Sequence, residues 1–262
     1  MPAAPLIDSH LHVFTRGMPF SPTAWCRPDY EFTVEQALAT LDAHGVASAV
    51  VAGCSLFGEY NDYTRWAVRT HPRLRGTVIV PPTTSRDELA TMKREGVVGV
   101  RFQWHHCEIP DLEGFEHQAF FARLRELDLH VHLNVNPERL HLVLPRLAAQ
   151  GVRLVLDHMG HPRGGTGTPG FRATLQAVAD GRAWVKLSGA YRSSEAAAEI
   201  DAYVAALAAA DPTRLLWGSD CPFIGVEQTT YAQVIAEHGR WAADPAFRAQ
   251  LDRNAFDFYF LH

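Results

Sequence analysis

Apolar, β-branched runs alternate with amphipathic stretches along the whole chain, at a steady spacing. The short runs are almost continuously apolar, which is typical of strands buried on both faces of a parallel sheet. We predict eight strands, at residues 6–12, 47–52, 75–80, 97–102, 130–135, 153–157, 183–187 and 214–218.

Between these runs lie segments with the helical spacing of apolar residues. We expect helices at residues 33–44, 60–71, 85–94, 114–127, 137–149, 170–180 and 194–210, then two more at 229–238 and 245–258. Gly96 and Gly151 each follow a helix and precede a strand, where a left-handed C-terminal cap belongs. Eight strands that are each followed by a helix predict an α/β fold, a single (β/α)8 TIM barrel.

An open, doubly wound sheet is the alternative architecture for this alternation. That fold usually carries a glycine-rich phosphate loop after its first strand, and this chain has His10-Leu11-His12 there. Because no linker, low-complexity tract or repeat interrupts the pattern, we predict one domain over residues 1–262.

Composition narrows the class of protein further. The chain has 262 residues, of which 47% are hydrophobic, and a formal net charge of -5, so neither nucleic acid nor an anionic membrane is an expected partner. We find no run of 18 apolar residues and no leader-like N-terminus, and therefore expect a cytoplasmic protein. The four scattered cysteines fit reduced thiols better than a disulfide framework.

Two histidines one residue apart end the first predicted strand. Residues i and i+2 of a strand share a face, so His10 and His12 project together. Because imidazole nitrogens need polar partners, the pair indicates half of a metal site or of an acid–base site. A hydrogen-bonded structural pair is the alternative.

Further reactive groups lie at the carboxyl ends of the predicted strands, where barrels carry their active sites. Asp220 follows the eighth strand, and is a candidate general base or metal ligand, or alternatively a turn residue before Pro222. Strand alternation lets only one of Asp157 and His158 face the barrel axis, and we predict that His158 does. For His161, in the loop that follows, a surface position and a site position both stay open.

Five polar residues are candidates for binding substrate. Arg101, in a buried strand, implies an anionic partner, either a substrate carboxylate or a neighbouring Asp or Glu. Tyr191 and Arg192 follow the seventh strand and are candidates for a second anion contact. Ser55 and Asn134 follow the second strand and end the fifth.

Three ordered motifs add a resemblance to this picture. They are Asp8-Ser9-His10-Leu11-His12, Leu156-Asp157-His158-Met159-Gly160 and Gly218-Ser219-Asp220-Cys221-Pro222. As a set they resemble the amidohydrolase superfamily, in the branch of 2-pyrone-4,6-dicarboxylate lactonases and sugar-lactone hydrolases. The resemblance covers the whole predicted barrel, and implies a hydrolase that opens a lactone, which is a cyclic ester.

The resemblance also implies the composition of the site. His10, His12, His158 and Asp220 match groups that bind one or two divalent ions in metal-dependent relatives, usually with a further histidine on the fifth strand. Asn134 stands at that position here, and an amide is a poorer zinc ligand than imidazole. His132, two residues deeper, is a weaker substitute. The resemblance therefore implies either no required cofactor or one Zn²⁺ held by these three histidines and Asp220.

The predicted reaction begins when Asp220 takes a proton from water, which then attacks the lactone carbonyl. The histidines polarise the carbonyl oxygen, directly when protonated or through Zn²⁺, and Arg101 anchors a substrate carboxylate. A second arginine that the lactonase relatives carry shortly after Arg101 is absent here, so the number of carboxylates on the substrate stays open.

Two alternatives compete with lactone hydrolysis. One is a Zn-dependent decarboxylase of the same superfamily, and the other is a non-catalytic ligand-binding barrel. All three hypotheses take a small molecule as the partner, and all three allow a homo-oligomer.

Overall fold

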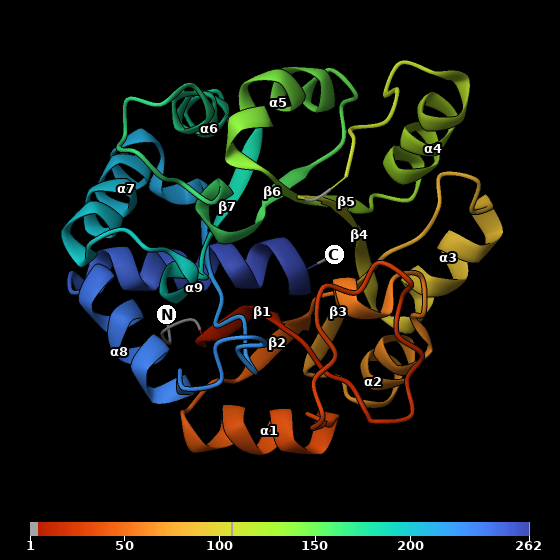
Figure 1. The fold of residues 1–262 in the computed structure, drawn as a ribbon, viewed down its shortest axis with the longest axis horizontal. Helices are drawn as coiled ribbons and strands as arrows, with labels where there is room; N and C mark the ends of the chain where they lie inside the picture. The colour runs from red at the N-terminus through yellow and green to blue at the C-terminus, as the bar shows by residue number, and fades with distance from the viewer. Residues whose placement is uncertain (1–4, 106, 262) are drawn as a thin grey trace.

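A ring of eight parallel strands forms the centre of the molecule, and helices surround it (Figure 1). The computed structural model describes residues 5–105 and 107–261. The strands neighbour one another in chain order, from β1 to β8. β1 meets the end of β8 through hydrogen bonds from His12 N to the Cys221 carbonyl and from Asp220 N to the His10 carbonyl, each 2.7 Å long. The predicted TIM barrel is therefore confirmed.

The elements lie close to the segments expected from the sequence. The strands are β1 Ile7–Leu11, β2 Ser48–Val51, β3 Leu74–Val78, β4 Val97–Trp104, β5 His130–Val135, β6 Leu154–Leu156, β7 Ala183–Leu187 and β8 Leu215–Trp217. The helices are α1 Val34–Ala43, α2 Asp62–Thr70, α3 Arg86–Glu95, α4 Phe115–Glu126, α5 Leu140–Ala148, α6 Pro169–Ala179, α7 Ala197–Ala210, α8 Tyr231–Trp241 and α9 Pro245–Phe260. Short 3₁₀ turns follow β2, β5, β6 and β7, and another precedes β8.

The last helix closes one end of the barrel. α9 lies across the amino-terminal ends of the strands (Figure 1), where its Phe258 and Tyr259 pack against Ile7, Val50 and other apolar residues that face the axis. This apolar plug removes water from the lower interior. The buried charged side chains of Arg101, Asp157 and Lys186 lie farther toward the carboxyl ends of the strands.

A bulge in β1 decides where its histidines point. The register with β2 shifts between Asp8 and Leu11, so β1 contains one residue more than its partner over this stretch. Ile7 packs in the apolar plug, and His10 still reaches the interior three residues later. His10 and His12 share a face as predicted, with 3.3 Å between their Nε2 atoms.

Asp8 joins three elements at the closure of the barrel. Its buried carboxylate accepts hydrogen bonds from His10 N (3.0 Å), Ser219 N (2.8 Å), Ser219 Oγ (2.5 Å) and Tyr231 Oη of α8 (2.9 Å). Burial raises the pKa of Asp8 to about 6, although these hydrogen bonds act in the opposite direction. Asp8 therefore fixes β1 to the segment after β8.

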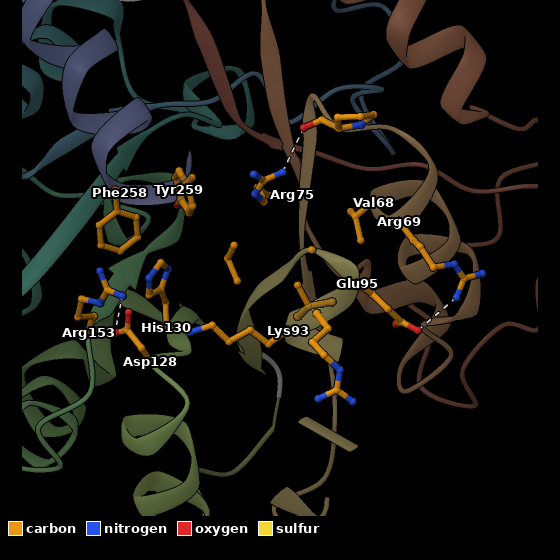
Figure 2. Close-up of a pocket in the computed structure, with 15 residues that line it drawn as sticks. Val68, Arg69, Arg75, Lys93, Glu95, Asp128, His130, Arg153, Phe258 and Tyr259 are labelled. Carbon is orange, nitrogen blue, oxygen red and sulfur yellow. Dashed lines mark hydrogen bonds and ion pairs between the residues drawn. The ribbon is translucent and has the colours of Figure 1, made fainter. Parts of the chain in front are cut away.

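The amino-terminal end of the barrel carries a basic cavity of about 380 Å³ beside α9 (Figure 2). Its cationic lining residues are Arg69, Arg75, Lys93, Arg94 and Arg153. No predicted site residue lines this cavity, which agrees with the expectation that the chemistry gathers at the opposite ends of the strands.

We predict that Asp8→Ala lowers the free energy of unfolding by about 3 kcal/mol or more, since it leaves buried backbone N–H groups of His10 and Ser219 without an acceptor. Urea unfolding measures the change. Asp257→Ala, at an exposed position of α9, is the matched control and stays within about 0.5 kcal/mol of the unsubstituted protein. Equal effects of the two substitutions would contradict the role of Asp8.

Candidate active site

The structure gathers the four predicted catalytic side chains at the carboxyl ends of the strands. Asp220 Oδ1 lies 3.5 Å from His10 Nε2 and 3.3 Å from His12 Nε2. Asp220 Oδ2 lies 3.9 Å from His158 Nε2. All four residues are buried, with 6% exposure or less, so their charges interact in a medium that is poorer in water than the surface.

Left-handed backbone conformations at His158 and Asp220 direct their side chains toward the centre of this cluster. β6 ends at Leu156, and His158 then has φ 53°, which breaks the alternation of the strand. The expectation that only one of Asp157 and His158 faces the axis is therefore wrong: both are buried in the interior. Asp220 has φ 64°, and its N–H donates to the His10 carbonyl. Non-glycine residues adopt this conformation at some cost in energy, which the surrounding contacts must offset.

Two glycines leave room for the imidazole rings. A Cβ at Gly218 would lie 2.7 Å from His10 Cβ, and a Cβ at Gly189 would lie 2.7 Å from His158 Nδ1. Gly189 also has φ 69°, a conformation that side chains disfavour. Neither histidine could keep its position beside a larger residue.

Asp220 is held by two groups from the turn after β7. Tyr191 Oη donates to Asp220 Oδ2 at 2.7 Å, and Arg192 Nε donates to the same oxygen at 2.6 Å. Burial alone would raise the pKa of Asp220, but the Arg192 guanidinium holds it well below its usual range. Asp220 is therefore a carboxylate at neutral pH, and its Oδ1 faces the histidines. Tyr191 and Arg192, predicted to contact a substrate anion, contact this carboxylate here.

Burial favours the neutral form of two histidines of the site, His10 and His158. Burial lowers the pKa of His158 to about 4. Burial and the ammonium of Lys186 lower the pKa of His10 well below its usual value. The expectation of direct polarisation by protonated histidines therefore needs correction for these two residues, because a buried imidazole loses the hydration that stabilises its cation.

A network of charges lies beneath the site. Arg101 Nε donates to Asp157 Oδ2 at 2.8 Å, and its Nη1 donates to the Gly53 carbonyl at 2.7 Å. Lys186 Nζ lies 3.1 Å from Asp157 Oδ1. Of the two partners considered for Arg101, the structure shows the neighbouring aspartate. Anchoring of a substrate carboxylate by Arg101 stays a prediction: the side chain is 3% exposed, and its Nε and Nη1 are already bound to Asp157 and to the Gly53 carbonyl.

Sequence reasoning missed Lys186 and Asp157 as members of the site. The available signal was the sequence Val185-Lys186-Leu187, in which a lysine interrupts a buried apolar strand. Lysine is almost never fully buried unless it is paired, so such a position predicts a charged partner in the interior.

The remaining candidates lie at the edge of the cluster. Asn134 Oδ1 accepts from His161 Nε2 at 2.8 Å, and the His161 ring is 5.1 Å from that of His158, so His161 lies at the site. Ser55 begins the 3₁₀ turn Ser55–Phe57 after β2, and no described contact joins its hydroxyl to the cluster. His132, the weaker candidate for the fifth ligand, is fully buried below them.

The donor set fits a divalent cation in one tautomeric arrangement. Ligand atoms of His10, His158 and Asp220 lie within 4.8 Å of one another, and imidazole with carboxylate suits zinc. His10 ligates through Nε2 only when its Nδ1 carries the proton, and Asp157 Oδ1 at 3.3 Å is the acceptor for that proton.

A parallel barrel with a buried histidine–aspartate cluster at its carboxyl mouth defines the class of protein, a TIM-barrel enzyme of hydrolase type. The chain belongs to the amidohydrolase family, because residues 7–261 match the family described as Amidohydrolase. It is 30% identical over 232 residues to 4-sulfomuconolactone hydrolase of Hydrogenophaga intermedia, which covers 83% of this chain and 75% of that protein. The crystal structure of a probable 2-pyrone-4,6-dicarboxylic acid hydrolase from Acinetobacter baumannii, with citric acid bound, is 30% identical, with a TM-score of 0.91 over 97% of this chain and 98% of that chain.

More distant structures share the fold alone. A zinc-bound amidohydrolase from Burkholderia multivorans is 20% identical, with a TM-score of 0.76 over 98% of this chain and 99% of that chain. A 2,6-dihydroxybenzoate decarboxylase is 14% identical, with a TM-score of 0.65 over 99% of both chains. The decarboxylases are therefore more distant than the lactone hydrolases.

We predict that Asp157→Asn lowers the free energy of unfolding by about 3–5 kcal/mol, because Arg101 and Lys186 then lose the charge that compensates their burial. Chemical denaturation measures the loss. Asp128→Asn is the matched control, since Asp128 pairs with Arg153 at the surface, and its effect stays below about 1 kcal/mol. A loss at Asp157 no larger than at Asp128 would show that the interior pairing does not stabilise the fold.

Proposed function

We propose that this protein hydrolyses a lactone of a small organic acid, with Asp220 as the general base. The observation that carries the proposal is the position of Asp220 Oδ1, which faces His10 and His12 while Oδ2 is bound by Tyr191 and Arg192. One oxygen is thus oriented by the protein and the other is directed to the reacting groups. The similarity to lactone hydrolases at about 30% identity supports the same reaction.

The reaction proceeds in two steps. Asp220 Oδ1 accepts a proton from water as the water oxygen forms a bond to the lactone carbonyl carbon, and N–H groups of His10 and His158 stabilise the negative charge on the carbonyl oxygen. The carbonyl then re-forms as the bond to the ring oxygen breaks. That oxygen takes the proton from Asp220, and the product is a hydroxy acid.

The low pKa of Asp220 limits how much of the rate proton abstraction from water can supply. A carboxylate that Arg192 stabilises is a weak base, so proton abstraction alone supplies a modest part of the rate. Orientation of the water and donors fixed around the carbonyl oxygen must supply the rest. The neutral state of His10 and His158 is suited to this, since neutral N–H groups still donate hydrogen bonds.

Arg192 is the proposed anchor for a carboxylate on the substrate. Its Nε binds Asp220, its Nη1 donates to the Ile224 carbonyl at 3.0 Å, and Nη2 makes no hydrogen bond to the described residues. A guanidinium binds a planar carboxylate in a directional way. Asn134 and Ser55 remain proposed contacts at the rim, and Tyr191 supports Asp220.

If the protein binds Zn²⁺, which requires His10 in the tautomer with its proton on Nδ1, we propose His10, His12, His158 and Asp220 as its ligands, where the cation would polarise the carbonyl. We also propose that residues 1–262 form one domain. We propose further that the protein acts in the cytosol and forms a homo-oligomer. No helix among the described residues is long and apolar enough to cross a membrane.

We predict that Asp220→Asn lowers kcat for lactone opening by about 10²–10⁴-fold, because the amide cannot accept a proton from water. The acid released by each turnover, followed with a pH indicator across a lactone panel, measures the rate. Asp257→Asn on the surface is the control, and keeps full activity. Activity close to that of the unsubstituted protein in a folded Asp220→Asn variant would remove Asp220 from the mechanism.

We also predict that a lactone with a free carboxylate is hydrolysed with a kcat/KM at least about 10-fold above that of its methyl ester, since one charge-assisted hydrogen bond to Arg192 is lost in the ester. The two substrates are compared on the same enzyme at low salt. Equal values would show that the site does not select for an anionic group.

A further inference from the structure

Lys186 is a fully buried lysine in the centre of β7, and the proposed reaction does not use it directly. Its ammonium nitrogen lies 3.1 Å from Asp157 Oδ1 and 3.1 Å from His10 Nδ1. The first contact balances a charge. The second contact joins a cation to the ring of a proposed catalytic histidine, on the side away from Asp220.

We propose that Lys186 is a positioning residue that fixes His10 in the tautomer with its proton on Nε2, so that His10 faces the substrate carbonyl as a preset hydrogen-bond donor. The inference rests on the proposed lactone hydrolysis for its chemical purpose. Its structural claim, the tautomer of His10, can be tested without any substrate.

The ammonium of Lys186 determines which way the hydrogen bond to His10 runs. An ammonium has three hydrogens and no lone pair, so it can only donate to His10 Nδ1. The Asp157 carboxylate, whose Oδ1 lies 3.1 Å from Lys186 Nζ, stabilises the charged form of the buried lysine. With Nδ1 as an acceptor, the single proton of a neutral His10 lies on Nε2.

Asp157 favours the other tautomer of His10, in which the proton is on Nδ1. Its Oδ1 lies 3.3 Å from His10 Nδ1, and would accept a proton carried there. Lys186 Nζ is closer to Nδ1, and it also forms an ion pair with this same carboxylate oxygen. The ammonium therefore decides between the two tautomers, and without it Asp157 would draw the proton of His10 to Nδ1.

The next histidine agrees with this assignment. His12 Nδ1 lies 2.8 Å from the Ala52 carbonyl, which can only accept, so His12 carries a proton on Nδ1 when it is neutral and offers a lone pair at Nε2. That lone pair lies 3.3 Å from His10 Nε2 and 3.3 Å from the carboxylate oxygen Asp220 Oδ1, so a hydrogen on His10 Nε2 would lie between two acceptors. Hydrogen bonds then run in one direction, from Lys186 to His10, to His12 and to Ala52.

This order of hydrogen bonds places a donor, His10 Nε2, beside Asp220. His10 Nε2 lies 3.5 Å from Asp220 Oδ1, next to the oxygen that we propose as the base. A carbonyl oxygen that enters beside this pair can take the hydrogen bond that His12 receives in its absence. A donor fixed before the reaction requires no reorganisation as charge develops on that oxygen.

Nitrogen-15 NMR of histidine-labelled protein tests the tautomer directly, with the His10 signals assigned by their loss in His10→Gln. In the unsubstituted protein we expect a protonated Nε2 and an unprotonated Nδ1. Lys186→Met should move the proton to Nδ1, and Lys186→Arg, which keeps the charge and the donors, should retain the original pattern. A proton on Nδ1 of the unsubstituted protein overturns the proposal, even if Lys186→Met fails to fold.

Kinetics separates positioning from a purely structural role. On a lactone that the enzyme opens, Lys186→Met should lower kcat by about 100-fold while KM changes by less than about 2-fold, and Lys186→Arg should recover most of the rate. Lys93→Met, at an exposed position of α3, is the control and should leave both constants unchanged. An unchanged kcat per folded Lys186→Met molecule overturns the positioning role. Absence of lactone hydrolysis in the unsubstituted protein would refute the proposed function and leave the tautomer measurement intact.

Discussion

The carboxylate of Asp157 lies between two buried cations, and the interior of the barrel is organised around it. Arg101 binds one oxygen from β4 and Lys186 binds the other from β7, so the aspartate joins strands on both sides of its own. Burial alone would raise the pKa of Asp157, but Lys186 and Arg101 hold it well below its usual range. Each of these charges is stable in the interior because the others are present. His10 rests against this network, and through His10 the network reaches the reacting groups.

The site contains two aspartates with different surroundings and therefore different uses. Asp157 is surrounded by cations and is fully buried, which suits a structural counter-charge. Asp220 has one oxygen bound by Tyr191 and Arg192, while the other faces His10 and His12. The free direction of that oxygen, rather than high basicity, is what suits Asp220 to the proposed role of general base. A lactone carbonyl is electrophilic enough for a weak base to suffice, provided that water and carbonyl are both oriented.

Family membership and geometry support the same reaction from different directions. The relatives share about 30% identity over most of this chain, and the lactone hydrolases among them are closer than the decarboxylase structure. The structure also shows which backbone features position the side chains of the site. They are a bulge in β1, left-handed residues at His158 and Asp220, and glycines beside His10 and His158. The backbone thus has local strain where the chemistry is placed, and the surrounding hydrogen bonds offset it.

The sequence alone determined the architecture, and it brought His10, His12, His158 and Asp220 to one end of the barrel. The alternation of buried strands and amphipathic helices depends on local periodicity, so eight strands and their order could be predicted, as could the shared face of His10 and His12. Tertiary structure decided what periodicity cannot encode. Arg101 pairs with Asp157, and His158 lies in the interior beside Asp157 because its left-handed conformation breaks the alternation of the strand. The contacts of Lys186 depend on the closed barrel, because its partners Asp157 and His10 lie 29 and 176 positions away in the chain.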